Sequence, residues 1–192
     1  MISKGQLNSG LIAMAGAGNS KAVLQLLDQG ADVNPPSGGD SALLCATARG
    51  HLGTVRLLIT RGADVNQPNR KGVTPLMIAA LNGRADLVAC LISNGAQVDL
   101  DLEHGDRAPA LIWAADNGHA EVAKLLLKHG ANVNSKDSSG NTALSIARSN
   151  GYASLIRLLK RAGAAEVAGG HHTPGRSVFG LQGGLPSLGK KQ

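Results

Sequence analysis

The fold is decided by the stretch Gly118-His-Ala-Glu-Val-Ala-Lys-Leu-Leu-Leu-Lys-His-Gly130. Its apolar residues Val122, Leu125 and Leu126 are spaced i, i+3, i+4, which places them on one face of an α-helix. A glycine that follows such a helix readily adopts the left-handed conformation that satisfies the last carbonyl groups. The stretch therefore predicts an amphipathic helix that ends at Gly130.

This pattern recurs along the chain at spacings of 32 to 35 residues. Each copy has a leucine, a glycine seven residues later and a Gly-Ala pair twelve residues after that glycine; the leucines are Leu11, Leu43, Leu76, Leu111 and Leu144. The residues around each leucine predict a second, shorter helix. Thr74-Pro75 opens one of these helices with a capping hydroxyl and a proline in the first turn. The sequence therefore predicts five copies of a helix pair.

The predicted helices have only about eight to ten residues each, whereas an isolated helix becomes marginally stable in water at about 12–15 residues. A single copy therefore cannot fold alone. Burial between neighbouring copies must supply the stability, so we expect the five copies to stack into an elongated array.

The repeat resembles the ankyrin repeat. The resemblance rests on motifs at Gly72-Val-Thr-Pro-Leu76, Gly118-His-Ala-Glu-Val122, Gly30-Ala-Asp-Val-Asn34, Gly62-Ala-Asp-Val-Asn66 and Gly130-Ala-Asn-Val-Asn134. It implies an all-α repeat fold: an ankyrin-type α-solenoid of five helix-turn-helix repeats with protruding β-turn fingers. The chain departs from the family in lacking the histidine after each motif leucine, and two extra residues fall between Asp101 and Pro109.

We expect two regions in the chain. Residues 1–164 form the ankyrin repeat domain, with repeats at about 7–34, 35–66, 67–99, 100–134 and 135–164. Residues 165–192 form a flexible, Gly-rich, basic C-terminal tail. The tail contains one apolar cluster, Ser177-Val-Phe179-Gly-Leu181, which is either a docking motif or an uncommitted segment.

Composition restricts the class of protein. Aromatic residues make up only 2% of the chain, so the core must be built from Leu, Val, Ile and Ala. Cys45 and Cys90 are too far apart in sequence to make a zinc site and are typical of small buried residues. No stretch is apolar enough to cross a membrane. We expect a monomer in the cytoplasm, with the nucleus as a possible location.

No constellation predicts catalysis. Gly16-Ala-Gly-Asn-Ser-Lys21 lacks the spacing of a phosphate-binding loop, and Gly18 is one of the repeat glycines. The six histidines do not cluster with metal-ligand spacing, although His171-His172 could bind a metal ion weakly. We therefore expect neither an enzyme nor a cofactor or metal site.

The resemblance implies that the turn tips and the exposed ends of the first helices bind a partner protein. The candidate residues carried over by position are Arg49, Arg70, Lys71, Val73, Leu81, Asn82, Arg107, Trp113 and Asp116. Among them, Arg49, Arg70, Lys71 and Arg107 form a basic set expected on one face about 10 Å apart. Trp113 is either an exposed anchor or a packing residue between copies, and packing is favoured.

The net charge of +6 agrees with a partner that has an acidic segment. We expect a scaffold or adaptor that holds another protein. The alternative is a regulatory inhibitor that clamps a partner enzyme, as ankyrin-type inhibitors of cyclin-dependent kinases do. Binding to nucleic acid or to a membrane surface is the weakest hypothesis, because the sequence has neither aromatic platforms nor a lysine-rich stripe.

Overall fold

The computed structural model describes residues 3–36, 39–100 and 108–165. These residues form ten helices, which are α1 (Lys4–Gly16), α2 (Ser20–Asp28), α3 (Ala42–Ala48), α4 (Leu52–Thr60), α5 (Pro75–Leu81), α6 (Ala85–Ser93), α7 (Ala110–Asp116), α8 (Ala120–Lys128), α9 (Ala143–Ser149) and α10 (Ala153–Arg161). Over this part of the chain there is no strand, only an isolated bridge between Lys136 and Thr142. The predicted all-α fold with five helix pairs is confirmed.

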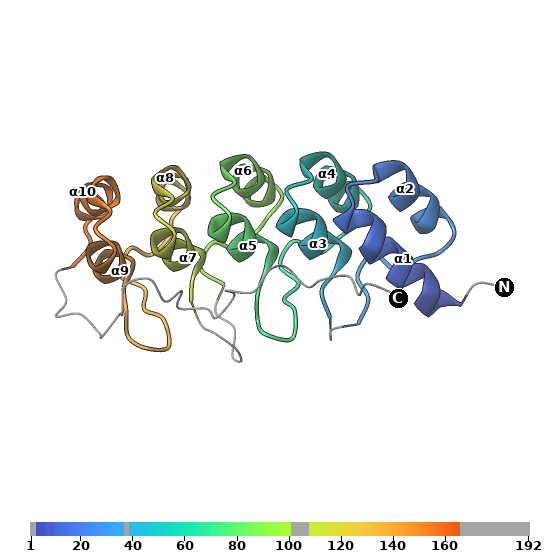
Figure 1. The fold of residues 1–192 in the computed structure, drawn as a ribbon, viewed down its shortest axis with the longest axis horizontal. Coiled ribbons are helices and arrows are strands. Elements are labelled where there is room, and N and C mark those ends of the chain that lie inside the picture. Colours follow the sequence, from blue (N-terminus) through green and yellow to red (C-terminus); the bar gives the residue numbers. More distant parts are fainter. Residues whose placement is uncertain (1–2, 37–38, 101–107, 166–192) are drawn as a thin grey trace, which may run out of the picture.

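The helices lie in two rows (Figure 1). The odd-numbered helices form an inner row and the even-numbered helices an outer row, and each helix packs on its neighbours within its row and on its own partner. The segments that join one pair to the next extend away from the outer row, below the inner row in Figure 1. We refer to the pairs as copies one to five, from α1–α2 to α9–α10.

Side-chain caps start most of the inner helices. Ser41, Thr74 and Thr142 each accept a hydrogen bond from the backbone N–H three residues later, at 3.1 to 3.3 Å. Such a cap satisfies one of the N–H groups that a helix leaves unpaired at its start. The helix α7 has no such cap and follows Pro109 instead. The first helix, α1, has 13 residues and begins at Lys4, before the expected start of the first repeat.

The core runs through the whole stack. All five motif leucines are buried, and so are the alanines and threonine that follow each of the first four by four positions, at Ala15, Thr47, Ala80 and Ala115. These small residues allow adjacent inner helices to approach closely. Copy five has the exposed Arg148 at the equivalent position. The stack of described copies therefore ends on a polar side chain.

Asparagine side chains that follow the outer helices form hydrogen bonds to the backbone of the next copy. Asn66 donates from Nδ2 to the carbonyl oxygen of Gly95 at 3.0 Å and accepts at Oδ1 from the N–H of Gln97 at 2.8 Å. Asn34 makes the same two bonds to Gly62 and Asp64, both at 2.8 Å. One side chain thus satisfies both a donor and an acceptor of the next copy.

The remaining expectations concern the ends of the chain. Within the described residues, no helix is long and apolar enough to cross a membrane. The expected C-terminal tail, including the cluster at Phe179, lies outside the described residues from position 166 onward. The repeat and domain boundaries themselves stay predictions.

Candidate protein-binding surface

The turn of copy three presents two cations on a hydrogen-bonded frame. Asn69 accepts at Oδ1 from the N–H groups of Lys71 and Val73, both at 3.0 Å, and its own N–H donates to the Val73 carbonyl oxygen. Arg70 and Lys71 lie at the tip of this turn and are exposed. Since local bonds hold the backbone in place, the two side chains project from a fixed base.

A second bond anchors this turn to copy two. The Nδ2 of Asn69 donates to Oδ1 of Asp40 at 2.9 Å, across 29 residues of sequence. The carboxylate of Asp40 is therefore held by Asn69 and forms no ion pair with Arg70 or Lys71 within 4.0 Å. The two neighbouring turns are thus joined without the cations at the tip being neutralised.

The other exposed candidates lie at the far ends of the inner helices. Arg49 follows α3 and Asn82 follows α5, and the Nδ2 of Asn82 donates to the Ala48 carbonyl oxygen at 3.3 Å. Leu81, the last residue of α5, is half-buried. A helix of seven residues is about 10 Å long. Arg49 was expected on one face with Arg70 and Lys71, but it lies at the opposite end of the inner helices. The described part of the basic set is therefore divided between the two ends.

Three of the candidate residues are buried instead of exposed. Trp113 has only 1% of its surface accessible, and its Nε1 donates to the Ala108 carbonyl oxygen at 2.9 Å. Val73 and Asp116 are 5% and 9% accessible. Trp113 is thus a packing residue, which was the favoured interpretation, and the alternative of an exposed anchor is wrong. Val73 and Asp116 were expected on the contact surface, and their burial contradicts that expectation. Arg107 lies outside the described residues.

The exposed candidate cations of copies two and three form no ion pair with the described part of the chain. Within the described residues, ion pairs join Lys4 to Asp32, Arg61 to Asp28, Arg84 to Asp86 and Lys124 to Glu121. Arg49, Arg70 and Lys71 have no carboxylate within 4.0 Å in this part of the chain. These three side chains are therefore available to carboxylates of another molecule.

Sequence reasoning missed two uncharged, half-buried residues of α3 that precede Arg49. Cys45 and Ala48 of α3 are half-buried and lie along the inner row beside Arg49. Burial, and secondarily the charge of Asp40, raises the pKa of the Cys45 thiol to about 11, so the side chain is neutral at pH 7. Their positions, two and five residues after the motif leucine Leu43, could have placed them on the same helix as Arg49.

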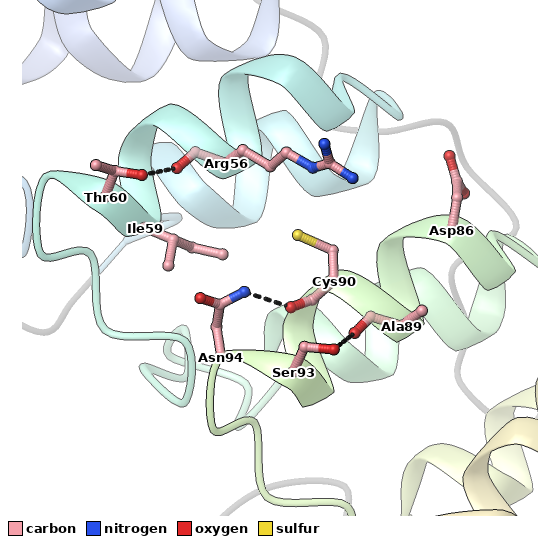
Figure 2. Close-up of a pocket in the computed structure, with 8 residues that line it drawn as sticks. All are labelled: Arg56, Ile59, Thr60, Asp86, Ala89, Cys90, Ser93 and Asn94. Atoms are coloured by element: carbon pink, nitrogen blue, oxygen red, sulfur yellow. Dashed lines mark hydrogen bonds between the residues drawn. The ribbon is translucent and has the colours of Figure 1, made fainter.

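The outer row contains a hollow of about 450 Å³ between α4 and α6. Figure 2 shows the side chain of Ile59 and the sulfur of Cys90 directed into this space. The hollow exists because α6 carries small residues, Ala89 and Cys90, where α8 carries Lys124 and Leu125. Its hydroxyl and amide groups are used locally, since Thr60, Ser93 and Asn94 each donate to a carbonyl oxygen of their own helix.

The described residues contain no group of three or more His, Cys, Asp or Glu side chains that could hold a metal ion. His51 and His119 each hydrogen-bond a carbonyl oxygen of the preceding copy, Gly16 at 3.1 Å and Leu81 at 2.9 Å. The expected tail histidines lie outside the described part.

Comparison with known proteins agrees with this arrangement. The family model for ankyrin repeats, which comprises three copies, matches residues 11–102 and 97–168. The chain belongs to the ankyrin repeat family. This ankyrin chain is also 40% identical over 97 residues to the B-cell lymphoma 3 protein homolog of Mus musculus, across 50% of the chain and 21% of that protein. It thus spans about one fifth of the length of that relative. Ankyrin repeats bind other proteins, and proteins built from them are typically not enzymes.

Proposed function

We propose that this ankyrin chain is a scaffold or adaptor that binds a partner protein across the inner row of copies two to four. The observation that supports the proposal most directly is the turn of copy three. There, Arg70 and Lys71 project from a hydrogen-bonded base, and no carboxylate of the described residues neutralises them. Because the backbone of the turn is already held in place, a partner that binds the two cations need not order the turn as well.

The chemistry of this surface defines the partner. Arg70 and Lys71 at one end and Arg49 at the other end suit carboxylate side chains, because a guanidinium group can bind a carboxylate through two parallel hydrogen bonds. On the helices between these two ends, Cys45, Ala48 and Leu81 are uncharged and half-buried, and we infer that they offer a largely apolar contact. We infer a partner segment that has acidic residues on both sides of a short apolar stretch.

The finer aspects of function belong to the same proposal. The partner meets this chain in the cytoplasm or the nucleus, which agrees with both cysteines being free thiols. A regulatory inhibitor that clamps a partner enzyme uses the same surface. It differs in outcome, since saturating amounts of this chain would then lower the activity of the captured enzyme.

The test compares two variants with the same change in charge. Arg70→Glu/Lys71→Glu reverses the cations of the turn, whereas Lys124→Glu/Lys128→Glu reverses two exposed cations of the outer helix α8. Affinity capture from cell extract, read by quantitative mass spectrometry, should show one or a few proteins that the wild-type chain and the α8 variant retain and the turn variant loses. The affinity of each retained protein, in purified form, is then measured for the wild-type chain, for both variants and for Arg49→Glu as a further inner-row variant.

The outcome that contradicts the proposal is equally specific. If the purified partner binds the turn variant and the wild-type chain within twofold, the inner row is not its binding surface. If both variants lose binding equally, and added salt abolishes it, the interaction is a response to net charge alone. Thermal unfolding of both variants checks that the stack is intact.

A further inference from the structure

The positive charge of the chain is concentrated on copy five. Residues 135–164 carry five basic side chains, Lys136, Arg148, Arg157, Lys160 and Arg161, against the single acidic residue Asp137. Copy five thus has a net charge of +4, out of +6 for the whole chain. All five basic residues are exposed, and α9 and α10 form the left-hand end of the stack in Figure 1.

The one carboxylate of copy five does not offset these charges. Asp137 is buried and accepts hydrogen bonds at Oδ1 from the N–H groups of Ser139 and Asn141, and at Oδ2 from Nδ2 of Asn141. Among the residues that the structure describes, Lys136, Arg157 and Arg161 have no carboxylate within 4.0 Å. Solubility at the end of a stack requires polar side chains but not five of one sign.

An apolar side chain lies beside the cations. Ile156 of α10 occupies the position that is fully buried, at 0% accessible surface, in every preceding copy, where Val23, Val55, Val88 and Ala123 stand. In those copies the outer helix packs against the outer helix of the next pair. Ile156 is only half-buried, because no described helix pair follows it. The end of the stack therefore combines a half-buried apolar side chain with Arg157 and Arg161, which have no carboxylate within 4.0 Å among the described residues.

We propose that the end face, made of Arg148, Ile156, Arg157, Lys160 and Arg161, is a second interaction surface that binds an acidic amphipathic segment of a partner protein. Carboxylates of the segment pair with Arg157 and Arg161, and an apolar side chain packs on Ile156. The apolar position favours a protein segment over a nucleic-acid backbone, which has phosphates but no matching side chain. The C-terminal residues of the chain itself are a poor occupant, since residues 165–192 carry Arg176, Lys190 and Lys191 against Glu166 alone.

This surface is distinct from the inner row of copies two to four and can be tested separately. Arg157 and Arg161 occupy the same positions in α10 that Lys124 and Lys128 occupy in α8, and all four are exposed. Arg157→Glu/Arg161→Glu and Lys124→Glu/Lys128→Glu therefore make identical changes in net charge on adjacent outer helices. The second variant controls for charge, and thermal unfolding of each variant controls for folding.

The probe is a synthetic 16-residue helical peptide with leucines on one face and glutamates beside them, and its affinity for the full chain is measured by fluorescence anisotropy. We expect the α10 variant to bind about tenfold more weakly and the α8 variant to bind within twofold of wild type. Replacing the leucines of the peptide by alanine should weaken binding about fivefold or more. Equal effects of the two variants, no effect of removing the leucines, or tighter binding to a DNA duplex or to phosphatidylserine vesicles than to the peptide would each overturn the proposal.

Discussion

The ring of His119 reaches back to the preceding copy and donates from Nε2 to the carbonyl oxygen of Leu81 at 2.9 Å. A carbonyl oxygen can only accept, so this bond assigns the proton to Nε2. The same ring lies over Gly83, where an added Cβ would be 2.6 Å from Nδ1 of His119. The backbone of Gly83 has φ of +67°, which side chains of L-residues rarely adopt. One histidine of copy four therefore both hydrogen-bonds and packs against the backbone of copy three.

The first prediction concerns this junction. His119→Ala removes one cross-copy hydrogen bond and should lower the free energy of unfolding by about 1 kcal/mol. Gly83→Ala should cost more than Gly95→Ala, because Gly95 also has positive φ but has nothing within 4 Å of an added Cβ. The difference between the stability losses of Gly83→Ala and Gly95→Ala should become smaller when His119 is also replaced by alanine. Urea unfolding of the two glycine variants with and without His119→Ala measures this coupling, and an unchanged difference would show that the ring is not the obstacle.

The second prediction concerns the asparagine that links copies two and three. Asn66→Ala removes both cross-copy bonds, to Gly95 and to Gln97, and should lower the free energy of unfolding by about 1–2 kcal/mol. Asn94→Ala is the control, since the Nδ2 of Asn94 bonds only the Cys90 carbonyl oxygen in its own helix, and it should cost clearly less. Equal losses in urea unfolding would mean that the cross-copy bonds add nothing beyond a local bond.

The third prediction separates packing from binding at Trp113. Trp113→Ala empties a fully buried site and should lower the free energy of unfolding by about 3–5 kcal/mol. Trp113→Phe keeps most of the ring but leaves the Ala108 carbonyl oxygen without its donor, at a cost of about 1–3 kcal/mol. Chemical denaturation measures both values. A Trp113→Ala protein of wild-type stability that fails to bind its partner would restore the role of an exposed anchor.

Much of this fold could be predicted from the sequence because its markers act locally. Glycines such as Gly83 and Gly130 are required wherever the backbone must turn with positive φ, so they stand at fixed places in each copy. The binding surface was less predictable. Arg49 follows its motif leucine by six residues and Arg70 precedes its own by six, so the two side chains lie at opposite ends of seven-residue helices. Burial of Trp113 depends on neighbours that no local pattern specifies.

The concentration of charge on copy five was visible in the sequence, but its meaning was not. Lys136, Arg148 and Arg157 form no run of basic residues in the sequence. The structure adds that α9 and α10, which follow or contain them, lie at the end of the described stack. Arg84 shows the converse case. It stands where His51 and His119 stand in other copies, and its guanidinium group also donates to a carbonyl oxygen of the preceding copy, that of Gly50 at 3.2 Å.

The last prediction follows from the Cys45 thiol, whose pKa rises from 9.0 to about 11 in the folded chain, mainly because of burial and then because of Asp40. The unfolded chain loses this proton near pH 9, whereas the folded chain keeps it until about pH 11. The folded state therefore binds more protons in this range, and the contribution of Cys45 to stability is present below pH 9 and lost as the pH rises toward 11. The free energy of unfolding of the wild-type chain should consequently fall more steeply between pH 9 and 11 than that of Cys45→Ala, in which lysine titration is unchanged. Parallel slopes for the two proteins in urea unfolding would show that the thiol titrates alike in both states.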